Sequence, residues 1–278
     1  MSKTWLITGA SRGLGLEMAR AALAAGDNVV ATARDIGSAS SAFTQHTDRL
    51  LLTPLDVTDP AAPLAVVKAA LARFGTIDVL VNNAGYGQLG LFEETPEEDI
   101  QRQLETNVNG LMRMTRAVLP VLRRQRSGHI INISSIGGLV SFDFCTLYGT
   151  SKFAVEGFSI NLARDIAPFG IHVTVVEPGM FRTDFLDDRS VRFSGSPIED
   201  YAQTREEAET LYKNFNHKQL GDPVKFGAAI VELANAAEPP LHLLLGSDAL
   251  KMARDDLALR QAEIERWQHL SASTDHQD

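Results

Sequence analysis

A serine, a tyrosine and a lysine in the middle of the chain have the types and spacing for proton transfer to or from an oxygen atom. Tyr148 and Lys152 are four residues apart, so on a helix they share one face, and Ser135 precedes them. An unperturbed tyrosine has a pKa of about 10 and is a poor acid–base catalyst at neutral pH. A lysine ammonium beside it favours the phenolate, so we expect Lys152 to lower the pKa of Tyr148. Ser135 would hydrogen-bond the same substrate oxygen.

A Tyr-x-x-x-Lys pair on a helix is usually an ordinary surface pair, so its context decides whether it is functional. Here the sequence predicts a strand, a turn and a helix that would bring the three side chains together. The apolar run Ile130–Ser135 ends in hydroxyls, which is typical of a buried parallel strand. Gly137 and Gly138 allow a sharp turn after it. The helix that follows carries Tyr148 and Lys152.

A glycine-rich turn follows the first predicted strand, Trp5–Thr8, and precedes a helix that we expect to reach about Ala25. This order points backbone N–H groups and a helix N-terminus at a phosphate group. The spacing G-x-x-x-G-x-G differs from the commoner G-x-G-x-x-G, and a turn needed only for packing is the alternative. The predicted phosphate-binding residues are Gly9, Ser11, Arg12, Gly13, Leu14 and Gly15.

The second predicted strand, Asn28–Ala33, leads directly into Arg34. An acidic residue at this place would bind a ribose 2′-hydroxyl, whereas an arginine suits a 2′-phosphate. Arg12 supplies a second positive charge, and Asp35 comes one residue too late to reverse the preference. The pattern favours NADP over NAD, with two solvated surface arginines as the alternative.

Other candidate cofactor residues follow the third, fourth and sixth predicted strands, Leu50–Leu55, Val79–Val81 and His172–Val176. An aspartate and a valine after the third strand could border an adenine, and small and amide residues after the fourth could support the sheet and leave room for a cofactor. A threonine after the sixth could bond a cofactor amide or phosphate. These candidates are Asp56, Val57, Asn83, Ala84, Gly85, Pro178, Gly179 and Thr183.

A helix predicted from a capping box at Thr95 to about Arg124 contains Asn107-Val108-Asn109-Gly110 in its middle. These residues are poor helix formers, so a local distortion is expected, with Asn107 holding a buried water.

Composition limits the classes of function. The 278 residues are 44% hydrophobic and 22% charged, with a formal net charge of −9 that opposes binding to nucleic acid or an anionic membrane. The single cysteine, Cys145, excludes an internal disulfide. No signal peptide and no apolar run of about 20 residues are apparent. We expect a cytoplasmic protein without nucleic-acid or membrane partners and without a metal site.

No repeat or linker divides the chain, so one domain over residues 1–270 is expected. Residues 184–221 are interpreted as an insertion in which the stretch from Arg189 is loop and Ile198–Phe215 is a charged helix. A seventh strand is predicted at Leu241–Leu245, and residues 271–278 are expected to be a disordered tail.

Taken together, these motifs resemble the short-chain dehydrogenase/reductase family in type and order. They are T-G-A-S-R-G-L-G, D-V, N-N-A-G, N-V-N-G, Ser135, Y-G-T-S-K and P-G with Thr183, over roughly residues 3–183. The resemblance implies an α/β fold: a Rossmann-type, doubly wound parallel sheet of seven strands in the order 3-2-1-4-5-6-7, with helices on both faces.

The resemblance also implies a catalytic tetrad of Asn107, Ser135, Tyr148 and Lys152. In carbonyl reduction the nicotinamide gives a hydride to carbon, Tyr148 protonates the oxygen and Ser135 polarises it. Lys152 would also bond the nicotinamide ribose, and Asn107 would hold a relay water. A homodimer or homotetramer is expected, formed through the helices after strands four and five.

The region from 184 to 221 resembles the substrate lid of hydroxysteroid and retinol dehydrogenase-like members. Aromatic and sulfur side chains near the reactive hydroxyls suggest an apolar cavity for a ketone, aldehyde or secondary alcohol, although such residues often only pack. They are Phe142, Phe144, Cys145, Met180, Phe181 and Phe185. A 3-oxoacyl thioester reductase is the alternative enzyme, with Arg189, Arg192 and Arg205 as the basic candidates. A dinucleotide-sensing protein without catalysis is a third possibility.

Overall fold

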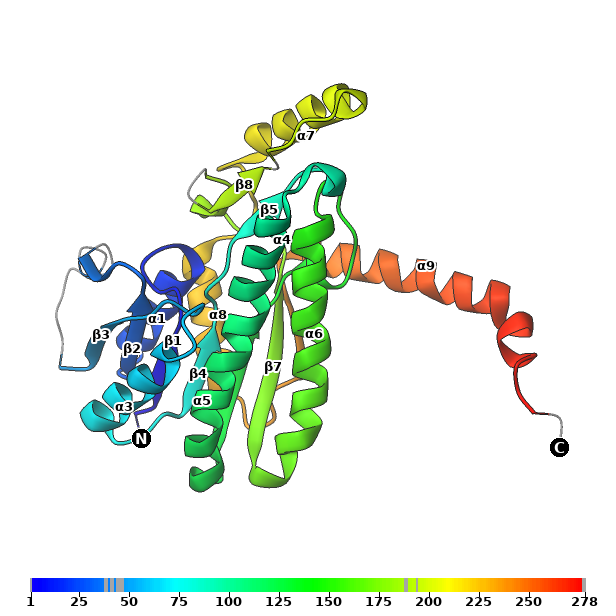
Figure 1. Cartoon of the computed structure of the whole chain (residues 1–278). Coiled ribbons are helices and arrows are strands. Elements are labelled where there is room, and N and C mark those ends of the chain that lie inside the picture. The colour runs from blue at the N-terminus through cyan, green and yellow to red at the C-terminus, as the bar shows by residue number, and fades with distance from the viewer. Residues whose placement is uncertain are drawn as a thin grey trace.

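A computed structural model describes residues 2–37, 40, 43, 48–187, 190–193 and 195–276. Seven parallel strands form one sheet in the order β3-β2-β1-β4-β6-β7-β9 (Figure 1). This is the predicted order, with the numbers shifted because β5 and β8 form a small sheet elsewhere. The strands are β1 Thr4–Ile7, β2 Asn28–Ala33, β3 Leu50–Pro54, β4 Val79–Asn82, β6 Gly128–Ile133, β7 Ile171–Pro178 and β9 His242–Leu245.

Helices cover both faces of this sheet, as predicted (Figure 1). Alternating strand residues feed two separate cores: Trp5 and Ile7 pack toward α1 and α8, while Leu6 packs toward α3, α5 and α6. The fold is therefore doubly wound. The helices are α1 Gly13–Ala24, α3 Ala62–Phe74, α4 Glu97–Leu104, α5 Gly110–Gln125, α6 Thr146–Ile166, α7 Ala202–Phe215, α8 Pro223–Asn235 and α9 Ser247–Ala272.

The helix predicted from Thr95 to Arg124 is interrupted, as its composition suggested. A π-helical stretch, Glu105–Asn109, separates α4 from α5. The predicted capping box is wrong, because the Thr95 hydroxyl donates to the Leu91 carbonyl oxygen at 3.1 Å instead of capping α4.

Two segments far apart in the sequence pair above the main sheet. Strand β5, Gly87–Leu89, pairs in parallel with β8, Val191–Phe193. The sequence analysis assigned residues 191–193 to a loop, which is wrong, because the strand that pairs with them was not recognised. The charged helix of this region, α7, begins at Ala202 rather than Ile198.

A buried ion pair attaches the segment that contains β8 and α7 to the rest of the molecule. The Glu94 carboxylate is buried, lies 2.9 Å from the Arg205 guanidinium, and accepts a hydrogen bond from Ile198 N at 2.8 Å. Residues 190–215 are thus held to the segment that follows β5, above the ends of the main strands (Figure 1).

The C-terminal helix α9 extends away from the body of the molecule (Figure 1). It continues to Ala272, so the predicted disordered tail is wrong at its start: Ser271 and Ala272 are helical. Residues 277 and 278 lie outside the described residues, as does most of the small, polar stretch 37–47. Among the helices described, none is long and apolar enough to cross a membrane.

Candidate active site

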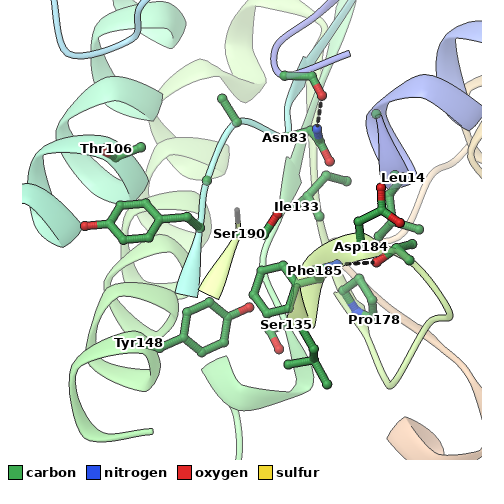
Figure 2. A pocket seen from close by; sticks show the side chains of 18 of the residues that line it. Leu14, Asn83, Thr106, Ile133, Ser135, Tyr148, Pro178, Asp184, Phe185 and Ser190 are labelled. Atoms are coloured by element: carbon green, nitrogen blue, oxygen red, sulfur yellow. Dashed lines mark hydrogen bonds between the residues drawn. The ribbon is translucent and has the colours of Figure 1, made fainter. Parts of the chain in front are cut away.

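A cavity of about 580 Å³ opens at the carboxyl ends of the parallel strands, where the strand order reverses between β1 and β4. Figure 2 shows part of its wall, with Tyr148, Ser135 and Phe185 pointing toward one another. All of the predicted cofactor residues and three of the four predicted catalytic residues line it. They are Gly9, Ser11, Arg12, Gly13, Leu14, Gly15, Arg34, Asp56, Val57, Asn83, Ala84, Gly85, Ser135, Tyr148, Lys152, Pro178, Gly179 and Thr183.

The glycine turn leaves no room for a side chain on Gly9 or Gly15. Gly9 has a φ of +67°, a left-handed conformation that favours glycine. A Cβ atom on Gly15 would lie 2.5 Å from Asn83 Nδ2 and closer still to the Gly9 carbonyl oxygen. Arg12, Gly13 and Leu14, at the start of α1, line the cavity, so the N–H groups of this first turn suit a phosphate.

Asn83 joins this turn to the end of β4. Its side-chain amide donates to the carbonyl oxygens of Thr8 and Gly9 at 2.9 and 3.0 Å, and its backbone N–H donates to the Thr8 hydroxyl at 2.9 Å. Behind it, the Asn82 amide donates to Thr115 and Asn132 at 2.9 and 2.8 Å. The prediction that amide residues here support the centre of the sheet is confirmed.

Positive charge gathers at the cofactor end of the cavity. Arg12, in the glycine turn, and Arg34, at the tip of β2, both line it. Asp56 faces the same space, but its carboxylate also accepts hydrogen bonds from the Thr58 N–H and hydroxyl at 2.9 and 2.7 Å. The pKa of Asp56 is lowered by these bonds and by the Arg34 guanidinium, against the effect of burial.

The residues after β7 close the other side of this cavity. The Asp248 carboxylate accepts from Met180 N at 2.7 Å and lies so near Gly179 that no side chain would fit there. The Thr183 hydroxyl accepts a 3.3 Å bond from Phe185 N. It therefore caps a short turn, while the side chain stands beside Gly13.

The three reactive side chains meet within the cavity wall. The Ser135 hydroxyl lies beside Tyr148, where it favours the phenolate, and it accepts a hydrogen bond from Gly137 N at 3.0 Å. The Lys152 ammonium lies 5.7 Å from the centre of the Tyr148 ring and donates to the Ile133 carbonyl oxygen at 2.9 Å. The Phe185 ring covers Tyr148, with ring centres 5.6 Å apart.

Burial, rather than the lysine, controls the titration of this group. Burial raises the pKa of Tyr148, and the hydrogen bond with Ser135 opposes the increase only in part. The predicted lowering of the Tyr148 pKa by Lys152 is therefore wrong for this structure. Burial also lowers the pKa of Lys152 to about 8, which the negative charge of Glu156 opposes. Lys152 does not lower the pKa of Tyr148 because its ammonium group is itself buried and donates its hydrogen bond to the Ile133 carbonyl oxygen.

Asn107 does not line the cavity. It lies buried in the π-helical stretch, where its amide oxygen accepts from Tyr86 N at 3.1 Å. Its amide nitrogen donates to the Tyr86 carbonyl oxygen at 3.0 Å and to the Ser151 hydroxyl at 3.1 Å. These bonds join the segment before β5 to α6. Asn107 thus lies behind the cavity wall and not among the residues that line it.

Five of the six predicted apolar residues line the cavity: Phe142, Cys145, Met180, Phe181 and Phe185. Phe144 does not. Arg192 on β8, one of the basic candidates of the sequence analysis, also lines the cavity. The sequence analysis missed further lining residues on or next to β5, α4 and α7, because the pairing of β5 with β8 was not recognised. They are Tyr86, Leu89, Arg102, Tyr212 and Gln219.

Residues 3–192 match the sequence model of the short chain dehydrogenase family. The chain belongs to that family. Among curated short-chain dehydrogenase relatives, Oxidoreductase BOA17 of Botryotinia fuckeliana is 39% identical over 99% of this chain and 100% of its own length. The 3-ketodihydrosphingosine reductase of Bacteroides thetaiotaomicron is 36% identical, with 87% of each chain covered.

Two solved structures have the same architecture. The crystal structure of one from Streptomyces avermitilis is 41% identical and superposes with a TM-score of 0.91, covering 99% of this chain and 100% of the other. ElxO with NADP bound is 28% identical, with a TM-score of 0.75 and coverages of 90% and 100%. This short-chain dehydrogenase is thus an oxidoreductase acting on CH–OH or C=O groups with a nicotinamide dinucleotide.

Proposed function

We propose that the protein is an NADP-dependent carbonyl reductase of apolar ketones or aldehydes, with Tyr148 as its proton donor. The observation that carries this proposal is that the open glycine turn and the Ser135–Tyr148–Lys152 group face one cavity. The glycine turn fits a dinucleotide because its residues line the cavity and side chains are excluded at Gly9 and Gly15.

Bound NADPH would supply the hydride that reduces a carbonyl carbon. Because burial keeps Tyr148 protonated at neutral pH, its hydroxyl is in the state required to donate a proton to the carbonyl oxygen. Ser135 would hold that oxygen, and Lys152 would hold the nicotinamide ribose. In the reverse reaction, alcohol oxidation, the same oxygen of Tyr148 would take the proton back.

Replacement of the phenol tests this assignment. Tyr148→Phe should reduce turnover by about 10²- to 10⁴-fold, the usual contribution of a general acid, while NADPH binds within about twofold of wild type. Tyr201→Phe is the control, because Tyr201 is exposed outside the cavity and bonds Glu93. Turnover by Tyr148→Phe at the level of this control would refute the proposed role.

The preference for NADP rests on Arg12 and Arg34 at the cofactor end, where no carboxylate takes the place of Arg34 at the tip of β2. The bound NADP of ElxO is consistent with it. Arg34→Ala should raise KM for NADPH about tenfold and leave KM for NADH nearly unchanged. Arg124→Ala, an exposed arginine of α5, is the matched control. Equal use of both cofactors by the wild type would contradict the proposal.

The residues that line the cavity away from the glycine turn favour an amphiphilic substrate. Phe142 and Phe185 make the cavity apolar beside Tyr148, and the relative named 3-ketodihydrosphingosine reductase carries a long-chain ketone in its name. Beyond them, the Arg192 guanidinium lies 5.9 Å from the Tyr86 ring centre and Arg102 lines the same wall.

These two arginines favour one second candidate, reduction of a 3-oxoacyl thioester whose carrier bears phosphate. Of the arginines selected from the sequence for this role, Arg205 is paired with Glu94 and Arg189 lies outside the described residues. A panel that contains a long-chain ketone and a 3-oxoacyl thioester, each tested with NADPH, decides between the candidates. Arg192→Ala should weaken only the thioester reaction.

We further propose that residues 1–270 form one dinucleotide-binding domain in which residues 184–221 act as the substrate lid. The Glu94–Arg205 ion pair and the β5–β8 pairing support this role, because they attach the lid to the segment around β5. Assembly as a homodimer or homotetramer through α5 and α6 is part of the same proposal. Light scattering at several concentrations tests the assembly, and a monomer throughout would contradict it.

A further inference from the structure

A second group of polar side chains lies on the far side of Lys152 and takes no part in the proposed reaction. Glu156 is one helical turn after Lys152 on α6, Glu177 is near the end of β7, and His242 begins β9. One donor atom from each of the three lies within 4.8 Å of the others. His242 Nδ1 is 2.8 Å from Glu177 Oε1 and 3.7 Å from Glu156 Oε2.

The two carboxylates are buried without enough hydrogen-bond donors. The side chains of Glu156 and Glu177 are 6% and 0% exposed, and each forms an ion pair with His242. Three of their oxygens, both of Glu156 and Oε2 of Glu177, have no hydrogen-bond donor among the described residues. The Ser134 hydroxyl lies beside Glu156 and favours its charged form, but its bonding partner is the Lys152 carbonyl oxygen at 3.5 Å. Buried polar atoms in this state are uncommon and costly.

We infer that Glu156, Glu177 and His242 form a binding site for one divalent cation of the Zn²⁺ type. A single proton shared by the two carboxyl groups would satisfy two oxygens, one as donor and one as acceptor, and would leave the third unpaired. A divalent cation among the three residues would compensate both carboxylate charges, with one oxygen from each carboxylate and one nitrogen of His242 as ligands.

The donor set selects the kind of ion. Zn²⁺ accepts imidazole nitrogen and carboxylate oxygen at about 2.0 to 2.2 Å, which places donors roughly 3 to 4 Å apart. The two distances from His242 Nδ1 are close to that range. Mg²⁺ prefers oxygen ligands and retains its waters, so it fits this site poorly. His242 is 43% exposed and gives the ion a route from solvent.

The location suggests a positioning role. A cation here would fasten α6, which carries Tyr148 and Lys152, to β7 and to the edge strand β9. The sequence analysis expected no metal site, because the three residues are far apart in the chain and form no recognisable spacing.

Titration of the full-length protein with ZnCl₂ after dialysis against EDTA tests the inference. Calorimetry should show one Zn²⁺ per chain in the wild type and no comparable heat with MgCl₂. Affinity should fall at least tenfold in His242→Gln and in Glu156→Gln. It should not change in His269→Gln, which replaces an exposed histidine on α9. At a hundredfold excess over the dissociation constant, Zn²⁺ should raise the wild-type Tm by roughly 5 to 10 °C.

Co²⁺ gives an independent signature, because visible d–d bands report a histidine–carboxylate environment in the wild type and should be lost in His242→Gln. The exposed position of His242 makes that variant suitable if Glu156→Gln does not fold. A wild type that binds no stoichiometric Zn²⁺ would overturn the inference and indicate a shared proton. Binding that survives both substitutions would also overturn it.

Discussion

The packing around Gly15 makes a sharp prediction about the first turn of α1. A methyl group at this position would lie 2.5 Å from Asn83 Nδ2 and nearer to the Gly9 carbonyl oxygen, about 1 Å short of an ordinary contact. Because the nearest atom is backbone, the turn itself has to move. Overpacking of this kind costs about 1 to 3 kcal/mol, and alanine recovers at most about 1 kcal/mol of helix propensity. Gly15→Ala should therefore destabilise the protein by about 1 to 2 kcal/mol.

The matched control is Gly157→Ala on α6, where a Cβ would meet nothing within 4 Å. There the same substitution should stabilise by about 0.5 to 1 kcal/mol. Thermal unfolding should show Tm lowered by about 2 to 8 °C for Gly15→Ala and raised by a few degrees for the control. NADPH titration followed by fluorescence should show binding about tenfold weaker for Gly15→Ala only. Unchanged Tm and affinity in Gly15→Ala would refute the packing argument.

Three further predictions concern the lid, the cavity and pH. Glu94→Gln leaves Arg205 without its buried partner, so trypsin should cut the lid several times faster than in the exposed control Glu93→Gln; equal rates would contradict the role of the ion pair. Phe185→Ala removes the ring over the catalytic phenol and should raise kcat/KM for a bulky ketone about tenfold relative to acetone-sized substrates; an unchanged ratio would show that this ring does not limit the cavity. Burial lowers the pKa of Lys152 to about 8 in the folded state from about 10.5 in the unfolded state, so the unfolded state binds more protons between these values and stability rises with pH there. Urea unfolding from pH 8 to 10 should favour the wild type over Lys152→Met by up to about 1.4 kcal/mol per pH unit, and parallel profiles would count against the shifted pKa.

Much of the fold could be predicted because its rules are local. Alternating strand residues such as Leu6 and Ile7 face opposite cores, and Asp222 caps α8 by accepting from Val224 N at 2.8 Å. The glycine turn was recognised because its backbone geometry leaves little choice of residue. The same holds for the poor helix formers around Asn107, where the π-helical stretch was found.

The errors occurred where a residue's partner is distant in the chain. Residues 191–193 become a strand only because Gly87–Leu89 lies beside them, and neither segment is strongly apolar on its own. The partners of Asn107 were not predicted either, because its amide bonds Tyr86 and Ser151 on two other parts of the chain. The placement of Arg192 over Tyr86 has the same origin, since β8 carries it there.

By itself the sequence determined the strands of the main sheet, the glycine turn and the residues that could react, because each depends on neighbours along the chain. Only the tertiary structure decided the titration of Tyr148 and Lys152 and the meeting of Glu156, Glu177 and His242. A charge responds to every dipole and to the water removed around it, so its energy is set by the surroundings that folding assembles.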